Sequence, residues 1–260
     1  MVELIFLGTG GAVATAERDN TSYVLDAGGR FSLIDCSGSV MGNLRRAGLD
    51  PLRLGFLFIT HVHPDHVFGL PSLIHSLFLD EGLIKLYGSP ETVRFCGELL
   101  DLFHLREPRI KMRVEFIPLT PGREFTLEGS TRVASFRVPH SPASLGYHFS
   151  LGEGNKELVC TGDTPPLADV FDRARGKDFL VHDCSAPERF FEMVPVLRTM
   201  HTSALELGRW AQDAGVQCLI PCHFFGEVDY PFSDIENEIR LHYDGRLILP
   251  RDLMKITLAE

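Results

Sequence analysis

The stretch Thr60-His61-Val62-His63-Pro64-Asp65-His66 decides how the rest of the chain is interpreted. It places four side chains that can bind a metal within six residues, directly after an apolar strand predicted at residues 55–59. The first two histidines are two positions apart and can face the same way in extended backbone, while the aspartate and the last histidine lie on the turn that opens the next helix. Imidazole and carboxylate groups suit zinc, and also manganese or iron. A helix N-cap at Asp65 beside surface histidines is the alternative interpretation.

The composition fits a globular protein with a large core. The 260 residues are 44% hydrophobic and 23% charged, enough to bury one core or two halves that share a core. The 25 basic and 35 acidic residues give a formal charge of -10, which argues against general binding of nucleic acid through its phosphates. The one dense basic stretch runs from Arg106 through Arg109 and Lys111 to Arg113. The solvated face of a strand is the favoured interpretation of this stretch, and a local basic patch is the alternative.

Cysteine spacing and hydropathy limit where the protein acts. The six cysteines form no CxxC pair and no dense framework, so we expect reduced thiols rather than a disulfide scaffold. The amino terminus lacks a basic start followed by a long apolar stretch, and no run approaches the ~18 apolar residues of a membrane span. We therefore expect a soluble, cytoplasmic protein without a membrane partner.

Short apolar strands alternate with segments of helical periodicity, which is typical of an α/β protein. Strands are predicted at residues 3–8, 55–59, 84–87, 113–118, 132–139, 146–151, 157–160, 179–182 and 217–221, with a hairpin over 22–35. Helices are predicted at 40–47, 67–79, 89–103, 166–174, 203–214 and 233–243. The four strands between residues 113 and 160 are expected to pair antiparallel in sequence order. Two strand-rich halves, each with helices, predict two sheets packed face to face with the helices outside.

A two-metal site needs more ligands than the opening stretch supplies, and three residues qualify. His140, Asp163 and His223 each follow a predicted strand. Side chains at the carboxyl ends of strands are where α/β architectures place functional groups. Taken singly, each could be a turn aspartate or a core histidine. Taken together, they favour a shared metal site.

Short motifs follow one another along nearly the whole chain: Leu7-Gly8-Thr9-Gly10-Gly11, Ile34-Asp35-Cys36, Thr60 to His66, His140-Ser141, Ser144-Leu145-Gly146-Tyr147, Thr161-Gly162-Asp163-Thr164, His201-Thr202-Ser203 and His223-Phe224. In this order they resemble the metallo-β-lactamase fold and, within it, the ribonuclease Z-like branch of hydrolases. It implies a four-layer αβ/βα sandwich, with residues 1–260 forming a single domain of two pseudo-similar αβ halves.

The resemblance also implies two divalent metal ions, with zinc expected first and manganese or iron as alternatives. One ion would be held by His61, His63 and His140, the other by Asp65, His66 and His223, and Asp163 would bridge them. Two ions, two carboxylates and a bridging hydroxide leave a net charge of about +1, which favours an anionic ester as substrate. The bridging hydroxide would be the nucleophile.

Asp65, His201 and Asp183 are the catalytic candidates. His201 matches the branch's histidine outside the metal shell, which implies that it protonates the leaving group or stabilises transition-state charge. Asp183 could orient His201, although many relatives have the longer glutamate there. A plain helix N-terminus is the alternative for His201. His148 stands where the branch usually has arginine; we expect it to line the pocket, whose shape around His148 and Phe224 should limit substrate size.

The spacing of two site residues bears on the substrate. Ribonuclease Z enzymes that trim tRNA carry a long arm between the third histidine and the bridging aspartate. Here Asp163 follows His140 by 23 positions (163 − 140), and a predicted strand hairpin fills them. We therefore expect a phosphodiesterase that acts on a small phosphodiester, such as a cyclic nucleotide or cyclic sugar phosphate, without a nucleic-acid partner. The alternatives are a sulfate-ester or lactone hydrolase, a tRNA 3'-end endonuclease and a non-catalytic metal-binding protein.

The resemblance to the family also makes a homodimer a possible oligomeric state.

Overall fold

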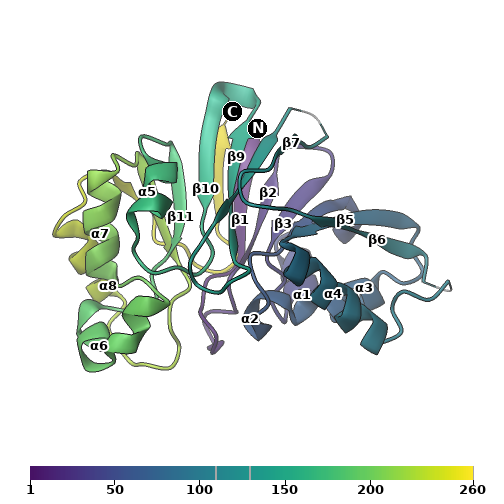
Figure 1. Cartoon of the computed structure of the whole chain (residues 1–260), viewed down its shortest axis with the longest axis horizontal. Helices are drawn as coiled ribbons and strands as arrows, with labels where there is room; N and C mark the ends of the chain where they lie inside the picture. Colours follow the sequence, from purple (N-terminus) through teal and green to yellow (C-terminus); the bar gives the residue numbers. More distant parts are fainter. Residues whose placement is uncertain (109, 129, 260) are drawn as a thin grey trace.

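The computed structural model describes residues 1–108, 110–128 and 130–259. Two sheets face each other and helices cover their outer sides (Figure 1). The first sheet has the strand order β14-β1-β2-β3-β4-β5-β6, and the second has the order β13-β12-β11-β10-β9-β8-β7. The predicted four-layer αβ/βα sandwich is therefore confirmed. Its division into two pseudo-similar halves of one domain stays a prediction, and Arg109 of the basic stretch lies outside the described residues.

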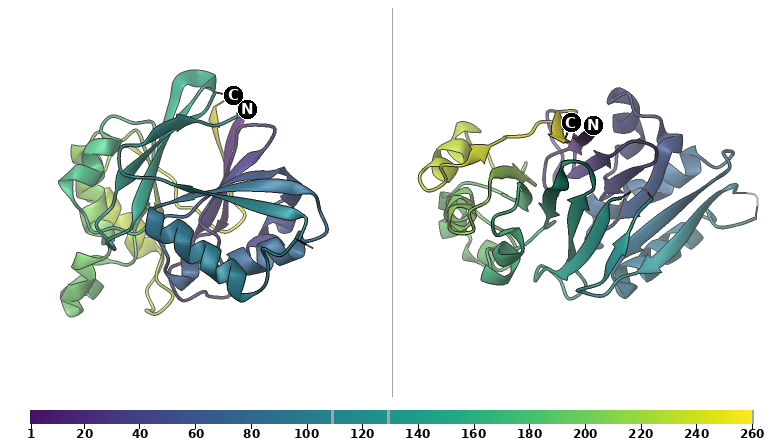
Figure 2. Two further views of the ribbon diagram at one scale, coloured as in Figure 1. Left: turned by 45° about the vertical axis from the view of Figure 1, so that its right-hand side comes forward. Right: turned by 90° about the horizontal axis from the view of Figure 1, so that it is seen from above.

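The first sheet and its helices take up the first part of the chain and its last strand. The strands are β1 (Val2–Gly8), β2 (Ser22–Asp26), β3 (Phe31–Ile34), β4 (Leu54–Phe58), β5 (Gly82–Gly88), β6 (Met112–Pro118) and β14 (Lys255–Ala259). The helices are α1 (Val40–Arg46), η1 (Pro51–Arg53), α2 (Pro64–Val67), α3 (Gly69–Ser76) and α4 (Pro90–Leu102). Because β14 pairs with β1, the two ends of the chain lie side by side (Figure 2).

The second sheet and its helices follow from residue 124 onward. The strands are β7 (Glu124–Thr126), β8 (Arg132–Arg137), β9 (Leu145–Leu151), β10 (Lys156–Cys160), β11 (Phe179–Asp183), β12 (Cys218–Cys222) and β13 (Arg246–Leu247). The helices are η2 (Glu153–Asn155), α5 (Ala168–Ala174), α6 (Glu188–Met193), η3 (Pro195–Thr199), α7 (Ala204–Asp213) and α8 (Ser233–Arg240). Helices α5, α7 and α8 lie on the outer side of this sheet (Figure 1).

The pairing of β6 differs from the prediction. The strand lies parallel to β5, with Ile84 opposite Val114, and does not continue the antiparallel run. A parallel pair needs a crossover connection, and α4 supplies it. The apolar pattern of β6 shows that it is a strand but not which neighbour it pairs with. The antiparallel order is confirmed for β8, β9 and β10.

Other elements were predicted incompletely. The helix expected over residues 67–79 is split into α2 and α3, which meet at Phe68. Pro64 begins the first of these helices one turn earlier than the apolar periodicity suggests. Short or late elements gave too little periodic signal to be predicted, namely β7, α6, β13 and β14.

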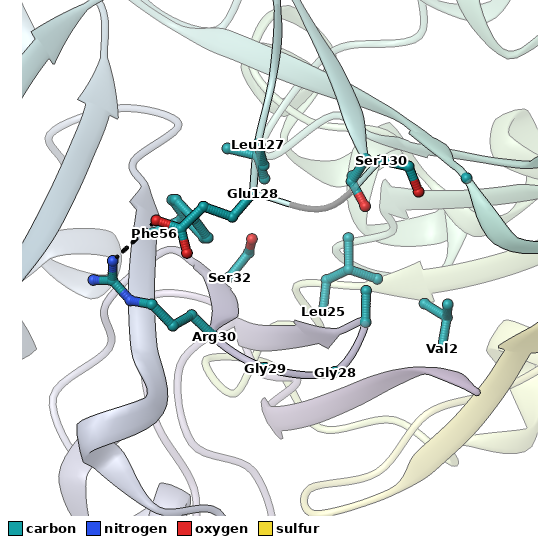
Figure 3. Close-up of a pocket in the computed structure, with 13 residues that line it drawn as sticks. Val2, Leu25, Gly28, Gly29, Arg30, Ser32, Phe56, Leu127, Glu128 and Ser130 are labelled. Carbon is teal, nitrogen blue, oxygen red and sulfur yellow. Dashed lines mark hydrogen bonds and ion pairs between the residues drawn. The ribbon is translucent and has the colours of Figure 1, made fainter.

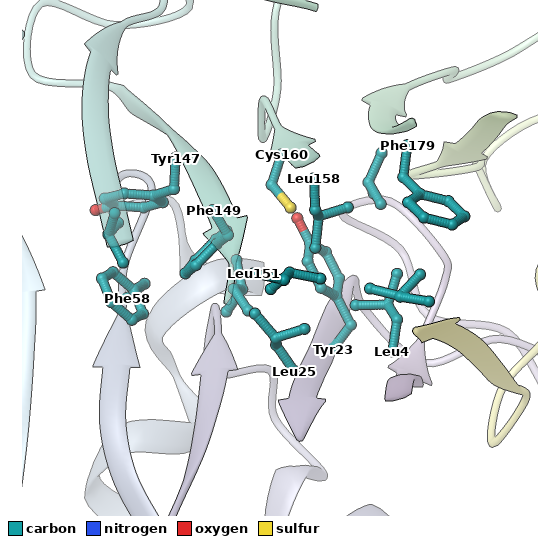
Figure 4. Packing of buried hydrophobic residues seen from close by; sticks show 14 of the residues in the cluster. Leu4, Tyr23, Leu25, Phe58, Tyr147, Phe149, Leu151, Leu158, Cys160 and Phe179 are labelled. Atoms are coloured by element: carbon teal, nitrogen blue, oxygen red, sulfur yellow. The ribbon is translucent and has the colours of Figure 1, made fainter. Parts of the chain in front are cut away.

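The core between the sheets is rich in aromatic rings (Figure 4). Phe58 at the end of β4 stacks on Tyr87, with ring centroids 4.8 Å apart, and meets Tyr147 and Phe149 edge-on at 5.0 and 5.3 Å. The Tyr147 hydroxyl donates a hydrogen bond to the carbonyl oxygen of Ile59 at 2.7 Å. The core therefore anchors the strand that leads directly into the histidine stretch.

A cavity of about 330 Å³ opens between the sheets at the edge near the chain ends (Figure 3). Leu25, Phe56 and Leu127 line it, and an ion pair between Arg30 and Glu128 lies at its side. None of the residues that line it is a predicted site residue.

Replacing Phe58 by alanine should lower the free energy of unfolding by about 3–5 kcal/mol, because a large buried ring leaves a cavity. Urea denaturation followed by circular dichroism measures the change. The matched control is Phe103→Ala, whose ring is 55% exposed and should cost about 1 kcal/mol or less. Equal losses in the two variants would contradict the anchoring role of Phe58.

Candidate metal centre

The seven predicted metal ligands meet at one edge of the sandwich, near α2 (Figure 1). The chain reaches this edge four times. The histidine stretch follows β4, His140 follows β8, Asp163 follows β10 and His223 follows β12. Parallel strands end at the same edge of a sheet, so residues far apart in sequence become neighbours.

The ligand atoms form two groups that share Asp163. The first group is His61, His63, His140 and Asp163, and the second is Asp65, His66, Asp163 and His223. The Oδ2 atom of Asp163 lies 3.7 Å from His140 Nε2 and 3.1 Å from His223 Nε2. Its Oδ1 atom lies 3.4 Å from His66 Nε2. One carboxylate therefore faces both groups, as a bridging ligand must.

Hydrogen bonds on the outer side of the site orient the imidazoles. His66 Nδ1 lies 2.8 Å from Asp35 Oδ2, and His140 Nδ1 lies 2.8 Å from the carbonyl oxygen of Met200. Such partners make Nδ1 the protonated nitrogen and leave Nε2 as the electron-pair donor. The rings therefore present the nitrogen that can bind a metal toward the centre of the site.

Asp35 belongs to the motif Ile34-Asp35-Cys36 and contacts the histidine stretch, a role that the motif does not predict. Its backbone has a φ of +57°, a conformation that residues with a Cβ seldom adopt. Its carboxylate accepts hydrogen bonds from the Thr60 backbone N–H and hydroxyl, both at 2.8 Å, and also holds His66. Asp35 therefore fixes both ends of the histidine stretch.

The state of two buried nitrogen atoms shows whether the residues of the site fit a metal ion. His61 Nε2 and His66 Nε2 are both buried, and neither makes a well-directed hydrogen bond to the described residues, although carboxylate oxygens lie 3.3–3.9 Å away. Buried polar atoms are almost always hydrogen-bonded, so such orphans need an explanation. Imidazole nitrogens beside carboxylates are the donors that zinc prefers, and a divalent cation would satisfy both atoms. The donor set therefore fits the implied metal ions.

The electrostatic environment keeps the carboxylates ionised. Burial alone would raise the pKa of Asp163, but the imidazoles of His223 and His66 hold it well below its ordinary value. Burial also opposes charge on His223, yet Asp163 and Asp65 raise its pKa to about 9. Without metal ions, protons on imidazoles therefore balance the carboxylates. Metal ions bind in competition with these protons.

His201 and Asp183 lie beside the second group. His201 Nδ1 is 2.9 Å from Asp183 Oδ2, so the shorter aspartate side chain makes the contact. The His201 ring stacks on His223, with centroids 5.3 Å apart, and lies 5.1 Å from the His140 ring. The Ser185 hydroxyl and the Thr164 backbone N–H donate hydrogen bonds to Asp183 and fix it. Ser203, and not His201, caps the helix that follows.

The expected positions of His148 and Phe224 are wrong. His148 lies on β9 and pairs with Glu157, on the face of the sheet opposite Tyr147 and Phe149 and away from the metal ligands. Side chains alternate along a strand, so a position between two core aromatics must face outward. Phe224 is fully buried against Phe232.

Phe225 is the aromatic residue that borders the site instead. Its ring lies 5.2 Å from His201 and 6.1 Å from His223, and it is only partly buried. A Cβ atom at Gly11 would come within 3.1 Å of Phe225 and 3.3 Å of His223, so a glycine allows the loop after β1 to lie against both rings. The sequence offered only one signal for Phe225, its place two residues after a ligand.

Comparisons with known proteins agree with the fold over its whole length. Ribonuclease Z of Methanosarcina mazei is 26% identical, and the alignment covers 98% of each chain. The metallo-β-lactamase fold protein YhfI of Bacillus subtilis superposes with a TM-score of 0.82 at 16% identity, covering 98% of both chains. The short form of human tRNase Z superposes with a TM-score of 0.78 at 22% identity, covering 99% of this chain and all of that one.

The fold, the site and these relatives define a hydrolase of the metallo-β-lactamase fold. The predicted resemblance to the ribonuclease Z-like branch is confirmed, and so is the enzyme class, a metal-dependent hydrolase that acts on ester bonds. The chain belongs to the family described as Anti-Pycsar protein Apyc1, whose model matches residues 2–207. None of the described helices is long and apolar enough to cross a membrane.

The place of Asp163 in both groups leads to a test of the metal site. Asp163→Asn should lower the metal content from two ions to one or fewer per chain, because both groups lose the charge of their shared carboxylate. Elemental analysis by mass spectrometry after dialysis measures this content. His75→Ala, which changes an exposed histidine on α3, should keep both ions. Two tightly bound ions in Asp163→Asn would rule out the bridge.

Proposed function

We propose that the protein is a phosphodiesterase that hydrolyses a small phosphodiester, with a cyclic nucleotide or a cyclic sugar phosphate as the first choice. The observation that carries this proposal is the connection between His140 and Asp163. It consists of β9, η2 and β10, folded as a compact hairpin in the second sheet. A tRNA-binding arm of the ribonuclease Z type would have to occupy this connection.

The length of the chain supports the same choice. The alignment with the Methanosarcina mazei ribonuclease Z runs over 306 positions, while this chain has 260 residues. At least 46 positions of that relative (306 − 260) therefore have no counterpart here. A formal charge of -10 also disfavours a large polyanion as substrate.

We assign the metal ligands as the resemblance implies: His61, His63 and His140 for one ion, Asp65, His66 and His223 for the other, and Asp163 for both. Two bound divalent ions, with zinc the first choice, would lower the pKa of a bound water and stabilise charge on the attacked phosphorus. Asp65 and Asp163 offset only part of the positive charge, so the site favours an anionic ester.

His201 is the proposed acid. Asp183 accepts the hydrogen bond from Nδ1, which leaves Nε2 on the other side of the ring for the oxygen of the leaving group. Stacking on His223 holds the imidazole in place. The carboxylates of Asp183 and Asp163 raise the pKa of His201 against the effect of its burial, so the ring holds a proton more readily than a free histidine. Phe225 beside it supplies an apolar wall for the organic part of a small substrate.

Replacing His201 by alanine should lower kcat about a hundredfold or more while both metal ions stay bound, since the loss of a general acid has this scale. Steady-state kinetics and elemental analysis measure the two quantities. His148→Ala is the matched control, because His148 also pairs with a carboxylate but lies away from the site; its kcat should stay within about twofold. Unchanged turnover in His201→Ala would remove His201 from the mechanism.

The substrate class can be tested with a panel of esters. We expect chelator-sensitive hydrolysis of bis-p-nitrophenyl phosphate and of at least one cyclic nucleotide or cyclic sugar phosphate, measured by absorbance and by chromatography. An aryl sulfate, a lactone and a tRNA precursor with a 3' extension test the alternatives. Faster turnover of one of these would replace the phosphodiester. A fully metallated protein without any turnover would support the non-catalytic metal-binding alternative.

Two further proposals concern the cellular location and the oligomeric state of the enzyme. We propose that it acts in the cytoplasm, where its six buried, unpaired cysteines stay reduced. We also propose a homodimer, which light scattering would test.

A further inference from the structure

His223 has a backbone conformation that needs support. Its φ is +66°, in the left-handed region that is unfavourable for a residue with a Cβ atom. Residues in such conformations persist only where the surrounding structure holds them. Of the two groups formed by the seven predicted ligands, His223 belongs only to the one with Asp65, His66 and Asp163; it also lies in a third group of possible ligands, with Asp183 and His201. Residues that stabilise the backbone of His223 should therefore affect the binding of one metal ion and not of the other.

The next residue, Phe224, is held by the loop that follows β1. The Phe224 backbone N–H donates a hydrogen bond to the Thr9 carbonyl oxygen at 3.1 Å. Its carbonyl oxygen accepts one from the Gly11 backbone N–H at 2.7 Å. The backbone after His223 is thus fixed from both sides by a segment more than 200 positions away in sequence.

One side chain, Arg18, connects this loop to Phe224. Its guanidinium carbon lies 4.7 Å from the centroid of the Phe224 ring and 4.2 Å from that of Phe232, so it packs on both rings. Its Nη1 atom donates hydrogen bonds to the Thr9 hydroxyl at 2.5 Å and to the Pro250 carbonyl oxygen at 3.0 Å. Thr9 in turn donates its hydroxyl hydrogen to Asp252 at 2.8 Å. Arg18 therefore joins four separate segments around the residue next to His223.

We propose that Arg18 is a positioning residue for His223 and thereby sets the occupancy of the metal position formed by Asp65, His66, Asp163 and His223. The inference rests on the proposed two-metal site. It predicts unequal effects, because the other metal position depends on different supports. His140 is held by Met200 and His61 by Thr60. Both supports are independent of Arg18.

Lysine cannot take over this role. A guanidinium is planar, packs flat on aromatic rings and donates several hydrogen bonds in fixed directions, whereas an ammonium group is a compact and strongly hydrated charge. The packing on two rings and the two hydrogen bonds use these properties together.

The experiment compares the full-length wild-type chain with Arg18→Met. Each protein is dialysed against buffered zinc and analysed for zinc per chain, and a cobalt titration followed by visible absorption resolves the two binding steps. Wild type should bind two ions in two steps. Arg18→Met should keep one step and weaken the other about 10–100-fold, the usual effect of losing a residue that orients a ligand. The weakened step, here termed the second, is the one assigned to the Asp65–His66–Asp163–His223 position. Arg18→Lys should weaken it to a similar degree.

The matched control is Arg53→Met. Arg53 also lies over an aromatic ring, with 5.9 Å from its guanidinium carbon to the centroid of Phe31, and it pairs with Asp26 at 2.7 Å. It lies in the first part of the chain, away from His223. This variant loses the same kinds of interaction and should bind both ions as wild type does. Thermal melting of the metal-free proteins shows whether the two variants are destabilised to a similar extent.

Several outcomes would overturn the inference. They are two ions at wild-type affinity in Arg18→Met, equal weakening of both steps, or weakening of the second step in Arg53→Met as well. If Arg18→Met does not fold, Phe232→Leu removes only one ring of the stack and should still weaken the second step; wild-type affinity there would overturn the role of Arg18. A wild-type chain that binds fewer than two ions would overturn the two-metal function itself, whereas two ions bound at wild-type affinity in both proteins would overturn the role of Arg18 alone.

Discussion

The contacts of the buried Asp163 carboxylate with histidines of both sheets are the interaction on which the geometry of the site depends. Asp163 follows β10 of the second sheet, yet it faces histidines that follow β4 of the first. Its negative charge is buried, which is unfavourable unless positive groups lie close by. Imidazoles from both parts of the chain supply that compensation. The buried charge of Asp163 is therefore compensated only where residues from both sheets come together at this edge.

The surrounding structure prepares this convergence before any ligand is considered. The aromatic core beneath the site fixes the end of β4 through Phe58, and Tyr147 reaches across from the second sheet to Ile59. Asp35 then accepts a hydrogen bond from the Thr60 backbone N–H and holds the His66 ring. These interactions form a series that leads from the apolar core to the predicted metal ligands. A rigid support of this kind is what a site with several fixed donors requires.

Much of the fold and of the ligand set could be predicted from sequence because both depend on local patterns. An apolar run followed by His, Asp or Thr can be recognised directly in the sequence. The order of the motifs then identified His140, Asp163 and His223 as candidate ligands. The partner of β6 could not be predicted, because strand pairing is decided by the crossover through α4 and not by the strand itself. His148 and Phe225 were misjudged or missed for a similar reason. The direction in which a side chain points depends on the register of its strand or on the path of its loop. The residue type does not determine either of them.

The loop after β1 shows how such non-local contacts limit what the site can accept. It lies against His223 and Phe225 because Gly11 has no side chain, and Asn20 fixes it by donating hydrogen bonds to the carbonyl oxygens of Gly11 and Ala12. One side of the metal site is thus closed by packed backbone. The exposed residue His63, one of the predicted ligands, marks the open side. This closure by backbone on one side is a reason for proposing a compact substrate, because a long chain would need room on both sides of the site.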